Sequence, residues 1–384
     1  MMGYLAKIRK KLVKYPLRCI FTDFYEVMRY FLCGGFEVVF YCRLKIHEDW
    51  IATTLEAIST KYSCALVLDY KKKESSLKGK VPIFRVGWFG MPLLKTKVAI
   101  SAATRPAGVF PVSIAPIRIH MPHSLVSLHM IYAPNSFRNY NALFCAGPHH
   151  CEEILRLREI EKDNMPMDVY RVGYGKYDIM CREYLQVRKL RRPKKNERHM
   201  ILLAPSWGES NILETIGLEL VDALVEEGYE IVIRPHPLFM SSESFVTFNN
   251  KYSSNHSVTI ENPWLHNKAL YICDLMISDY SGVAYEYAFL RELPVVFVDV
   301  PIKENNRRWK EIDITPMELS LREVVGVLCE PKVDLIIEGV NAVMQHMSDY
   351  KDQIRNIRDN YIYNPCLCSQ AASERIDELI SRGG

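Results

Sequence analysis

The sequence predicts an α/β protein with two domains, each built on a parallel β-sheet. The chain has 384 residues, of which 48% are hydrophobic and 24% charged, and this size suits two globular cores better than one. In both halves, short apolar runs alternate with helical patterns, which indicates parallel strands joined by helical crossovers. The basic stretch RKLRRPKKNER at 188–198 contains Pro193 and has no apolar periodicity. We therefore expect a first domain at 1–187, a linker at 188–198 and a second domain at 199–345.

Residues 1–30 form a basic and aromatic segment with a helical pattern. Its basic cluster near the N-terminus consists of Lys7, Arg9, Lys10, Lys11, Lys14 and Arg18. Charged residues such as Asp23, Glu26 and Arg29 interrupt the apolar stretch that follows, so it predicts neither a transmembrane span nor a signal peptide. Two interpretations stay open, namely a helix on an anionic membrane surface and a solvated helix packed on its own domain.

The rest of the first domain reads as alternating strands and helices. Strands are expected at 36–42, 64–70, 81–87, 97–104 and 117–120. A helix is expected at 47–60, and a short strand running into a helix at 142–160.

The second domain repeats this alternation, and three of its strands end in polar loops. Strands are expected at 200–204, 230–234, within 269–282, and at 293–301, with an amphipathic helix at 211–229. Residues 346–384 look helical, and in two-domain folds of this kind such helices often return to the first domain.

Charge and cysteine content limit the partners. The net charge of +4 gives no strong field for nucleic acid, so we expect no nucleic-acid partner. The eleven cysteines are scattered without a CxxC pair, which predicts reduced, mostly buried thiols in a cytoplasmic protein. No histidine stands at zinc-finger spacing around Cys366 and Cys368, the only close pair. We expect no structural metal site and no cofactor, and the sequence leaves open whether a metal assists the reaction.

Three polar loops follow second-domain strands, at 205–208, 234–237 and 278–282. The carboxyl ends of parallel strands lie on one edge of a sheet, where ligands bind, so these loops are expected to converge. A helix that starts after the third loop offers free N–H groups and partial positive charge to a phosphate. The predicted donor-binding residues are Ser206, Trp207, Gly208, Arg234, Ser278, Asp279, Tyr280, Ser281, Gly282 and Glu286.

These residues have different expected roles. Ser278 and Ser281 would donate hydroxyl hydrogen bonds, whereas the Asp279 carboxylate would repel phosphate and more plausibly caps the helix or orients a neighbour. Glu286 lies one turn into the helix and could accept hydrogen bonds from ribose hydroxyls. Taken alone, the third loop also fits a well-capped helix with no ligand.

Histidines in both halves are candidates for proton transfer. His236 stands in RPHP, where two prolines stiffen the strand exit and Arg234 suits phosphate binding. In the first domain, His120 and His123 flank Pro122 after a strand, and a histidine there could act as a general base across a cleft. The remaining acceptor-side candidates are Ser124, His149 and His150.

Several of these motifs, in this order, resemble the CDP-glycerol glycerophosphotransferase family. They are ILLAPSWGES, YEIVIRPHP and MISDYSGVAYEYAFLRELPVVFVD, preceded by GPHHCEEI and VGYGKYD, and together they span about 145–300. The resemblance implies a GT-B fold, in which two Rossmann-like domains face each other across a cleft. It also implies that the two important histidines are His123 and His236. The chain departs from the family pattern at Ser124, which replaces a glycine, and at Gly282, which replaces the second serine of a Ser-Ser pair.

The expected function is transfer of a polyol phosphate from a CDP-activated donor to a hydroxyl of a lipid-linked or polymeric surface-glycan acceptor. The donor nucleotide is then a substrate, and the enzyme works in the cytoplasm or on the inner face of the membrane. The two departures leave another donor open, such as a different CDP-polyol or a nucleotide sugar. The alternatives are a GT-B glycosyltransferase that uses a nucleotide sugar, a related epimerase, and a non-catalytic nucleotide-binding partner in polysaccharide export.

Overall fold

The computed structural model describes the chain from residue 17 to residue 383, with short gaps. The residues not described are 1–16, 45–46, 69–74, 88, 104–113, 162–167, 191–197, 263–266, 305 and 384. Most of the basic N-terminal cluster and most of the expected linker at 188–198 therefore lie outside the described residues.

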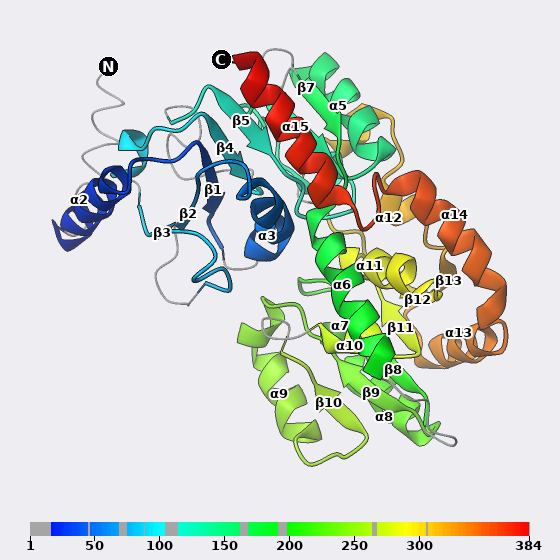
Figure 1. Ribbon diagram of the computed structural model, residues 1–384. Helices are drawn as coiled ribbons and strands as arrows, with labels where there is room; N and C mark the ends of the chain where they lie inside the picture. Colours follow the sequence, from blue (N-terminus) through cyan, green and yellow to red (C-terminus); the bar gives the residue numbers. More distant parts are fainter. Residues whose placement is uncertain are drawn as a thin grey trace.

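The first half of the chain forms a seven-stranded parallel sheet with the order β3-β2-β1-β4-β5-β6-β7 (Figure 1). Its strands are β1 (Val38–Cys42), β2 (Cys64–Leu68), β3 (Ile83–Phe84), β4 (Val98–Ser101), β5 (Ile117–His120), β6 (Ala142–Cys145) and β7 (Asp168–Arg171). β1 lies near the middle of the sheet, and all five residues of its sequence VVFYC are buried, as expected for a strand covered on both faces. The expectation of a parallel sheet in this half is confirmed.

Helices cover both faces of this sheet. They are α2 (Leu17–Leu32), α3 (His47–Ile58), η1 (Met91–Leu93), α4 (Leu128–Ile131), α5 (Pro148–Glu161) and α6 (Gly175–Leu190). α6 enters the expected linker as far as Leu190. Neither α6 nor β7 was expected from the sequence. β7 is a partly exposed strand at the edge of the sheet with the sequence DVYR, which lacks the apolar run that marks the other strands.

The second half forms a six-stranded parallel sheet with the order β10-β9-β8-β11-β12-β13. Its strands are β8 (Met200–Leu203), β9 (Glu230–Ile233), β10 (Val258–Ile260), β11 (Leu275–Ser278), β12 (Val295–Val298) and β13 (Gly326–Cys329). The helices are α7 (Ile212–Thr215), α8 (Gly217–Glu226), η3 (Phe239–Ser241), α9 (Glu243–Tyr252), α10 (Lys268–Ile272), α11 (Gly282–Arg291), η4 (Trp309–Ile312), α12 (Met317–Ser320) and α13 (Val333–Gln345). Both sheets are parallel, so the α/β class with two Rossmann-like halves is confirmed.

The helix expected at 211–229 is interrupted. Asn211 caps α7 by accepting hydrogen bonds from two backbone N–H groups, and the chain leaves helical geometry at Ile216 before α8 begins. A Cβ atom on Gly217 would stand 2.7 Å from the Phe248 ring of α9, so the close packing of α9 requires glycine there. Periodicity alone could not reveal this break, because both segments keep their apolar residues on one face.

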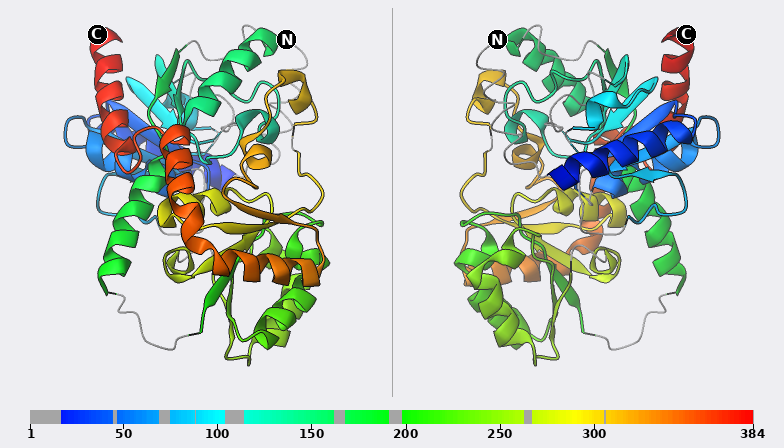
Figure 2. Two further views of the ribbon diagram at one scale, coloured as in Figure 1. Left: turned by 90° about the vertical axis from the view of Figure 1, so that its right-hand side faces the viewer. Right: turned by 90° about the vertical axis from the view of Figure 1, so that its left-hand side faces the viewer.

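The C-terminal helices cross from the second domain to the first. They are η5 (Met347–Tyr350), α14 (Lys351–Tyr361) and α15 (Cys368–Gly383). α15 packs against α3 and α6, and its residues Ala372 and Ile376 belong to the same apolar core as β1 and β2 (Figures 1 and 2). Cys181 on α6 forms a disulfide with Cys366, so the expectation of reduced thiols is wrong for this pair, which is separated by 185 residues.

One apolar cluster joins the two domains. It contains Leu125, Val126 and Tyr174 from the first domain, and Ala284 and Tyr285 from the second, all buried. The segment after β5 and helix α11, which both carry predicted site residues, contribute side chains to this cluster. Among the described residues, no helix combines the length and apolar character needed to cross a bilayer.

Asp178 provides a test of how α15 is held. Its carboxylate is buried on α6 and accepts hydrogen bonds from the backbone N–H groups of Cys368, at 3.0 Å, and Ser369, at 2.7 Å. Asp178→Ala leaves both N–H groups at the start of α15 without an acceptor, so we expect the free energy of unfolding to fall by about 2 kcal/mol. Urea unfolding followed by circular dichroism measures this.

The matched control is Asp349→Ala, which removes an exposed carboxylate from η5. We expect this control to change stability by less than about 0.5 kcal/mol. Equal stability of the two variants would show that Asp178 does not hold α15.

Candidate active site

The His123 loop, residues 121–127, follows β5 and is fixed by two histidines of the first domain. Nε2 of His149 donates to the carbonyl oxygen of Leu125 at 2.7 Å, and Nε2 of His150 donates to that of Val126 at 3.0 Å. Nδ1 of His150 accepts the N–H of Ala146 at 3.2 Å. Both side chains are buried, and burial lowers the pKa of His150 to about 3. These two residues therefore position the His123 loop, which corrects the expectation that they contact the acceptor.

His120 is also a core residue. Its side chain is fully buried and packs against the rings of Tyr132, Phe137 and Tyr140. Burial holds its pKa well below the ordinary value. The expectation of a role on the acceptor side is not supported, because the strand directs this side chain into the apolar interior.

His123 itself is only partly buried and is held by aromatic residues. Its ring lies 4.8 Å from the Trp50 ring, measured between centroids, and its Nδ1 forms a hydrogen bond with the Tyr132 hydroxyl. Burial lowers the pKa of His123 to about 4, although the nearby Ala102 carbonyl opposes this shift. The imidazole is therefore neutral at pH 7.

On the second domain, two predicted phosphate ligands instead connect neighbouring loops. The Ser278 hydroxyl is buried and donates to the carbonyl oxygen of Ala204 at 2.7 Å. Asp279 is buried and accepts the backbone N–H of Ser206 at 2.7 Å. Ser278 thus has no free hydroxyl for a phosphate, and Asp279 fixes the loop after β8 rather than capping α11.

Tyr280 and the Trp207 loop lie at the edges of the predicted site. The Tyr280 hydroxyl donates to Asp299 at 3.3 Å, and the Arg322 guanidinium lies 4.6 Å from the centre of its ring. Trp207 is exposed, and Gly208 has φ 99°, a backbone conformation that favours glycine.

Arg234 is already paired. Its Nη1 donates to Glu261 at 2.5 Å and its Nη2 to the Asn267 side chain at 2.8 Å. These contacts tie the end of β9 to the segment before α10, and they leave the guanidinium engaged within the second domain. The expectation that Arg234 is the phosphate clamp is therefore not supported.

Lys303 provides a cation at this rim that was not expected from the sequence. It lies in the loop after β12, and its Nζ donates to the Ser206 hydroxyl at 2.5 Å. Desolvation lowers the pKa of Lys303, while the Asp279 carboxylate opposes this change. Its position after the apolar strand VVFV, on the same sheet edge as the other loops, was a signal that could have identified it.

His236 lies close to this lysine. Burial, and secondly the charge of Lys303, lowers its pKa to about 4, so the ring is neutral at pH 7. Nδ1 accepts the backbone N–H of Leu238 at 3.2 Å, which assigns the ring proton to Nε2. His236 can therefore donate a hydrogen bond to an anion without carrying charge.

The two domains meet at the first turn of α11. Ser281 stands at the N-cap, and its side chain makes no capping hydrogen bond. A Cβ atom on Gly282 would lie 3.0 Å from the Ser124 hydroxyl oxygen, so the His123 loop approaches the start of α11 closely. This contact brings residues next to His123 against the predicted phosphate-binding turn.

Glu286 forms part of the same junction. Its carboxylate accepts hydrogen bonds from the Tyr174 hydroxyl at 2.7 Å and from Nζ of Lys176 at 2.6 Å. The Tyr174 oxygen also lies 3.3 Å from the carbonyl oxygen of His123. Glu286 is buried and joins α11 to the first domain, which corrects its expected role as a free acceptor for ribose hydroxyls.

The loop that carries Lys303 also reaches the first domain. The Asn306 side chain donates to the carbonyl oxygen of His129 at 2.8 Å, and the backbone N–H of Ser127 donates to Glu318 at 3.0 Å. Burial raises the pKa of Glu318 to about 7. One side of the junction is thus closed by second-domain residues bound to α4 and the loop before it.

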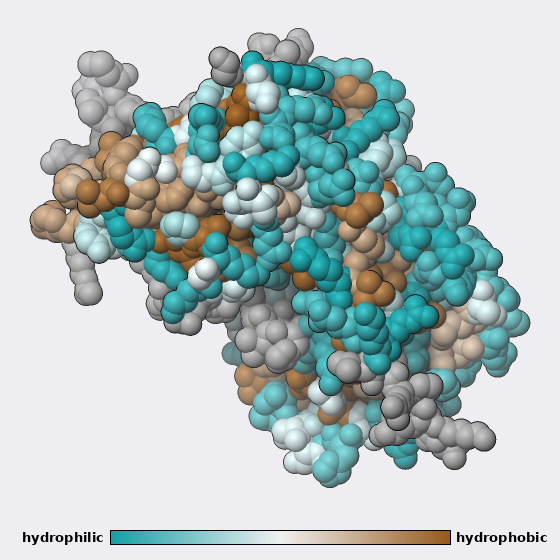
Figure 3. All heavy atoms as spheres, in the orientation of Figure 1, coloured by the Kyte–Doolittle hydropathy of each residue, from teal (hydrophilic) through white to brown (hydrophobic). Residues whose placement is uncertain are grey.

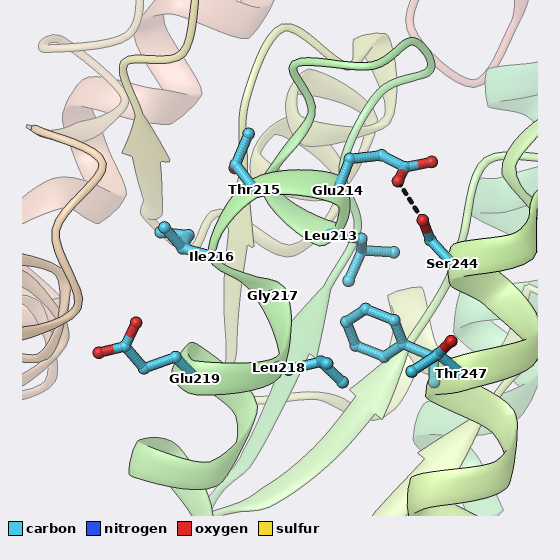
Figure 4. A pocket seen from close by; sticks show the side chains of 10 residues that line it. Leu213, Glu214, Thr215, Ile216, Gly217, Leu218, Glu219, Ser244 and Thr247 are labelled. Atoms are coloured by element: carbon cyan, nitrogen blue, oxygen red, sulfur yellow. Dashed lines mark hydrogen bonds between the residues drawn. The ribbon is translucent and has the colours of Figure 1, made fainter.

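Other possible sites are separate from this junction. A pocket of about 260 Å³ lies between α7, α8 and α9, with Glu214 bound to Ser244 (Figure 4). It contains none of the predicted site residues. Within the described part of the chain, no cluster of three or more metal-ligating side chains occurs.

The family model for CDP-glycerol:poly(glycerophosphate) glycerophosphotransferase matches residues 136–381. No curated protein sequence matches the chain. Among solved structures, the wall teichoic acid polymerase TagF, in a structure with CDPG, is 15% identical with a TM-score of 0.58, covering 90% of this chain and 89% of that chain.

Two further solved structures are similar over the whole domain pair. The UDP-GlcNAc 2-epimerase of Neisseria meningitidis bound to UDP-GlcNAc is 13% identical with a TM-score of 0.59, covering 89% of this chain and 99% of that chain. MurG of Acinetobacter baumannii is 12% identical with a TM-score of 0.50, covering 89% and 99%. At such identities the likeness shows the fold alone, which is GT-B.

The charge of Lys303 beside His236 predicts a measurable pKa change. A nearby positive charge disfavours imidazolium, so Lys303→Met should raise the pKa of His236 above its value of about 4. Burial remains in the variant and keeps the pKa below 6.5. Histidine NMR titrations of wild type and variant measure the shift.

Lys310→Met is the matched control, because Lys310 is an exposed lysine of η4. An unchanged His236 titration in Lys303→Met, or an equal shift in the control, would contradict the assigned proximity.

Proposed function

This chain belongs to the CDP-glycerol:poly(glycerophosphate) glycerophosphotransferase family, and from this premise we propose how residues at its domain junction transfer glycerol phosphate from CDP-glycerol. The enzyme works in teichoic acid synthesis, and the acceptor that we propose is a hydroxyl group of a lipid-linked polymer. CDP-glycerol is consumed as a substrate, and the proposed steps use the chain's own side chains.

The observation that carries the proposal is the close approach of the His123 loop to the first turn of α11. Ser124 lies against Gly282, and Tyr174 connects the backbone of His123 to Glu286 on α11. We expect a diphosphate bound at this turn to have His123 of the first domain on one side. Lys303 and His236, in loops at the edge of the second sheet, would lie on the other side. Backbone N–H groups and the Ser281 hydroxyl would contact the phosphates.

In the proposed reaction, the acceptor hydroxyl oxygen attacks the phosphorus atom that carries glycerol. The bond from this phosphorus to the bridging oxygen breaks, and CMP leaves with the electron pair. His123 accepts the proton of the attacking hydroxyl. This is possible at pH 7 because the imidazole is neutral there, with a pKa of about 4. Trp50 and Tyr132 fix the ring orientation.

His236 and Lys303 would stabilise the leaving group. Nε2 of His236 would donate a hydrogen bond to a phosphate oxygen, and Lys303 would supply positive charge. Arg234 would not, because its guanidinium is already paired with Glu261. Positioning and electrostatic stabilisation dominate phosphoryl transfer, so these contacts would carry most of the rate enhancement.

We further propose that α2 holds the enzyme on the anionic cytoplasmic face of the cell membrane, where a lipid-linked acceptor would be found. One face of α2 is anchored, because the buried Asp23 accepts N–H groups of Gly87 and Gly90. The other face exposes large apolar side chains, and Figure 3 shows the brown surface there. They are Leu17, Phe21, Phe24, Tyr25, Met28, Phe31 and Leu32. The basic residues at 7–14 precede this face in the sequence and would attract anionic lipids.

The mechanism predicts that His123→Ala and His236→Ala each lower turnover of CDP-glycerol by about 10²–10⁴-fold. Lys303→Ala should lower it by about 10²-fold or more, since a charge that stabilises the phosphate is lost. CMP release in the presence of polymer acceptor measures these rates. His256→Ala changes an exposed histidine of the second domain and should retain wild-type activity. Wild-type turnover by His236→Ala, or turnover of UDP-GlcNAc in place of CDP-glycerol, would contradict the proposal.

The membrane role predicts that replacing Phe21, Phe24 and Phe31 with serine lowers binding to phosphatidylglycerol vesicles at least about tenfold, because apolar area buried in the lipid is lost. Co-sedimentation with vesicles measures binding. The control replaces Leu155 and Leu185, which are exposed apolar residues on α5 and α6, and should bind as wild type. Unchanged binding by the triple variant would exclude α2 as the contact.

A further inference from the structure

Ser124 of the first domain and Gly282 of the second domain lie against each other. The Ser124 hydroxyl oxygen is 3.0 Å from the place of a Cβ atom on Gly282, and the methyl carbons of Val126 are 3.5 and 4.0 Å from it. A serine at 282 would direct its side chain into the space that Ser124 fills. A hydroxyl group of the first domain therefore lies at the first turn of α11.

The Ser124 hydroxyl acts as an acceptor within the His123 loop. Its oxygen accepts the backbone N–H of Val126 at 3.3 Å. Among the described residues, the structure gives this hydroxyl no acceptor, and the side chain is partly exposed. It can therefore donate to an anion at the domain junction.

The segment that carries Ser124 is firmly held. The carbonyl oxygens of the next two residues, Leu125 and Val126, each accept a hydrogen bond from a buried histidine. The Ser127 hydroxyl accepts a hydrogen bond, at 2.8 Å, from the backbone N–H of Met317, which belongs to the second domain. Ser124 therefore keeps its position over Gly282 when no ligand is present, and little ordering is needed on binding.

We propose that Ser124 donates its hydroxyl hydrogen bond to a non-bridging oxygen of the transferred phosphate, across the domain junction. The inference rests on the proposed function and deepens it. Ser124 is adjacent to His123, the base that faces the attacked phosphorus, so its contact is with the group that moves and not with CMP. Ser281 keeps the remaining hydroxyl of the turn on the second domain. A side chain at position 282 would crowd the Ser124 hydroxyl.

The proposed contact predicts different effects of a Ser124 substitution on the donor CDP-glycerol and on the product CMP. CDP-glycerol contains the transferred phosphate, whereas CMP lacks it. Ser124→Ala should lower kcat/KM for CDP-glycerol by about 10–100-fold, as expected for a lost hydrogen bond to a charged group. It should leave the calorimetric Kd for CMP within about twofold, because leaving-group contacts remain.

A hydroxyl exchange tests the geometry. Ser124→Gly should resemble Ser124→Ala, and Gly282→Ser should lower kcat/KM roughly threefold or more through crowding. The double variant Ser124→Gly/Gly282→Ser restores one hydroxyl and removes the crowding. Its kcat/KM should exceed that of Ser124→Gly at least about threefold, a coupling that independent sites would not show.

Control variants and a folding assay distinguish failure of the Ser124 inference from failure of the proposed function and from misfolding of a variant. Ser59→Ala removes an exposed hydroxyl from the end of α3 and should change nothing. Thermal unfolding checks that each variant is folded. Three results would overturn the inference even if His236→Ala is inactive. They are wild-type activity in Ser124→Ala, a loss of CMP affinity in Ser124→Ala as large as its loss of kcat/KM, and a double variant no more active than Ser124→Gly. If the wild type neither binds nor turns over CDP-glycerol, the proposed function fails and the inference fails with it.

Discussion

The contact between the His123 loop and the first turn of α11 is the constraint on which the rest of the site depends. A Cβ atom at position 282 would stand 3.0 Å from the Ser124 oxygen, which makes this a tight contact. Buried apolar residues of both domains surround it, and Glu286 adds hydrogen bonds from Tyr174 and Lys176. Separating the domains would leave the Glu286 carboxylate without its hydrogen-bond donors. The His123 loop and the helix terminus therefore remain in contact before any substrate binds.

This arrangement combines two neutral imidazoles with one cation. Burial lowers the pKa of His123 and of His236 to about 4, so neither ring carries charge at pH 7. A neutral His123 can accept a proton, and a neutral His236 can donate from Nε2. Positive charge comes from Lys303 and from the start of α11, while Arg234 is neutralised by Glu261. Desolvation makes both rings neutral, and the hydrogen bond that His236 Nδ1 accepts from Leu238 assigns the donor role to His236.

The sequence predicted the fold better than the site. Buried strands such as β1 and β12 have continuous apolar runs, whereas the edge strand β7 has none and was missed. The RPHP and Ser-Gly motifs follow β9 and β11 at the same edge of the parallel second sheet, as expected. Sequence could not show that Arg234 and Glu286 are paired, because their partners are 27 residues away or on the other domain. Lys303 was missed because a single lysine in a loop has no pattern of its own.

The most direct test of the account is a crystal structure with CDP-glycerol bound. The account predicts that the diphosphate lies at the first turn of α11, within hydrogen-bonding distance of Ser281 Oγ and Lys303 Nζ. The His123 ring should face the phosphorus atom that carries glycerol. A diphosphate bound away from this turn, or a phosphorus atom that the His123 ring cannot approach, would contradict the central claim.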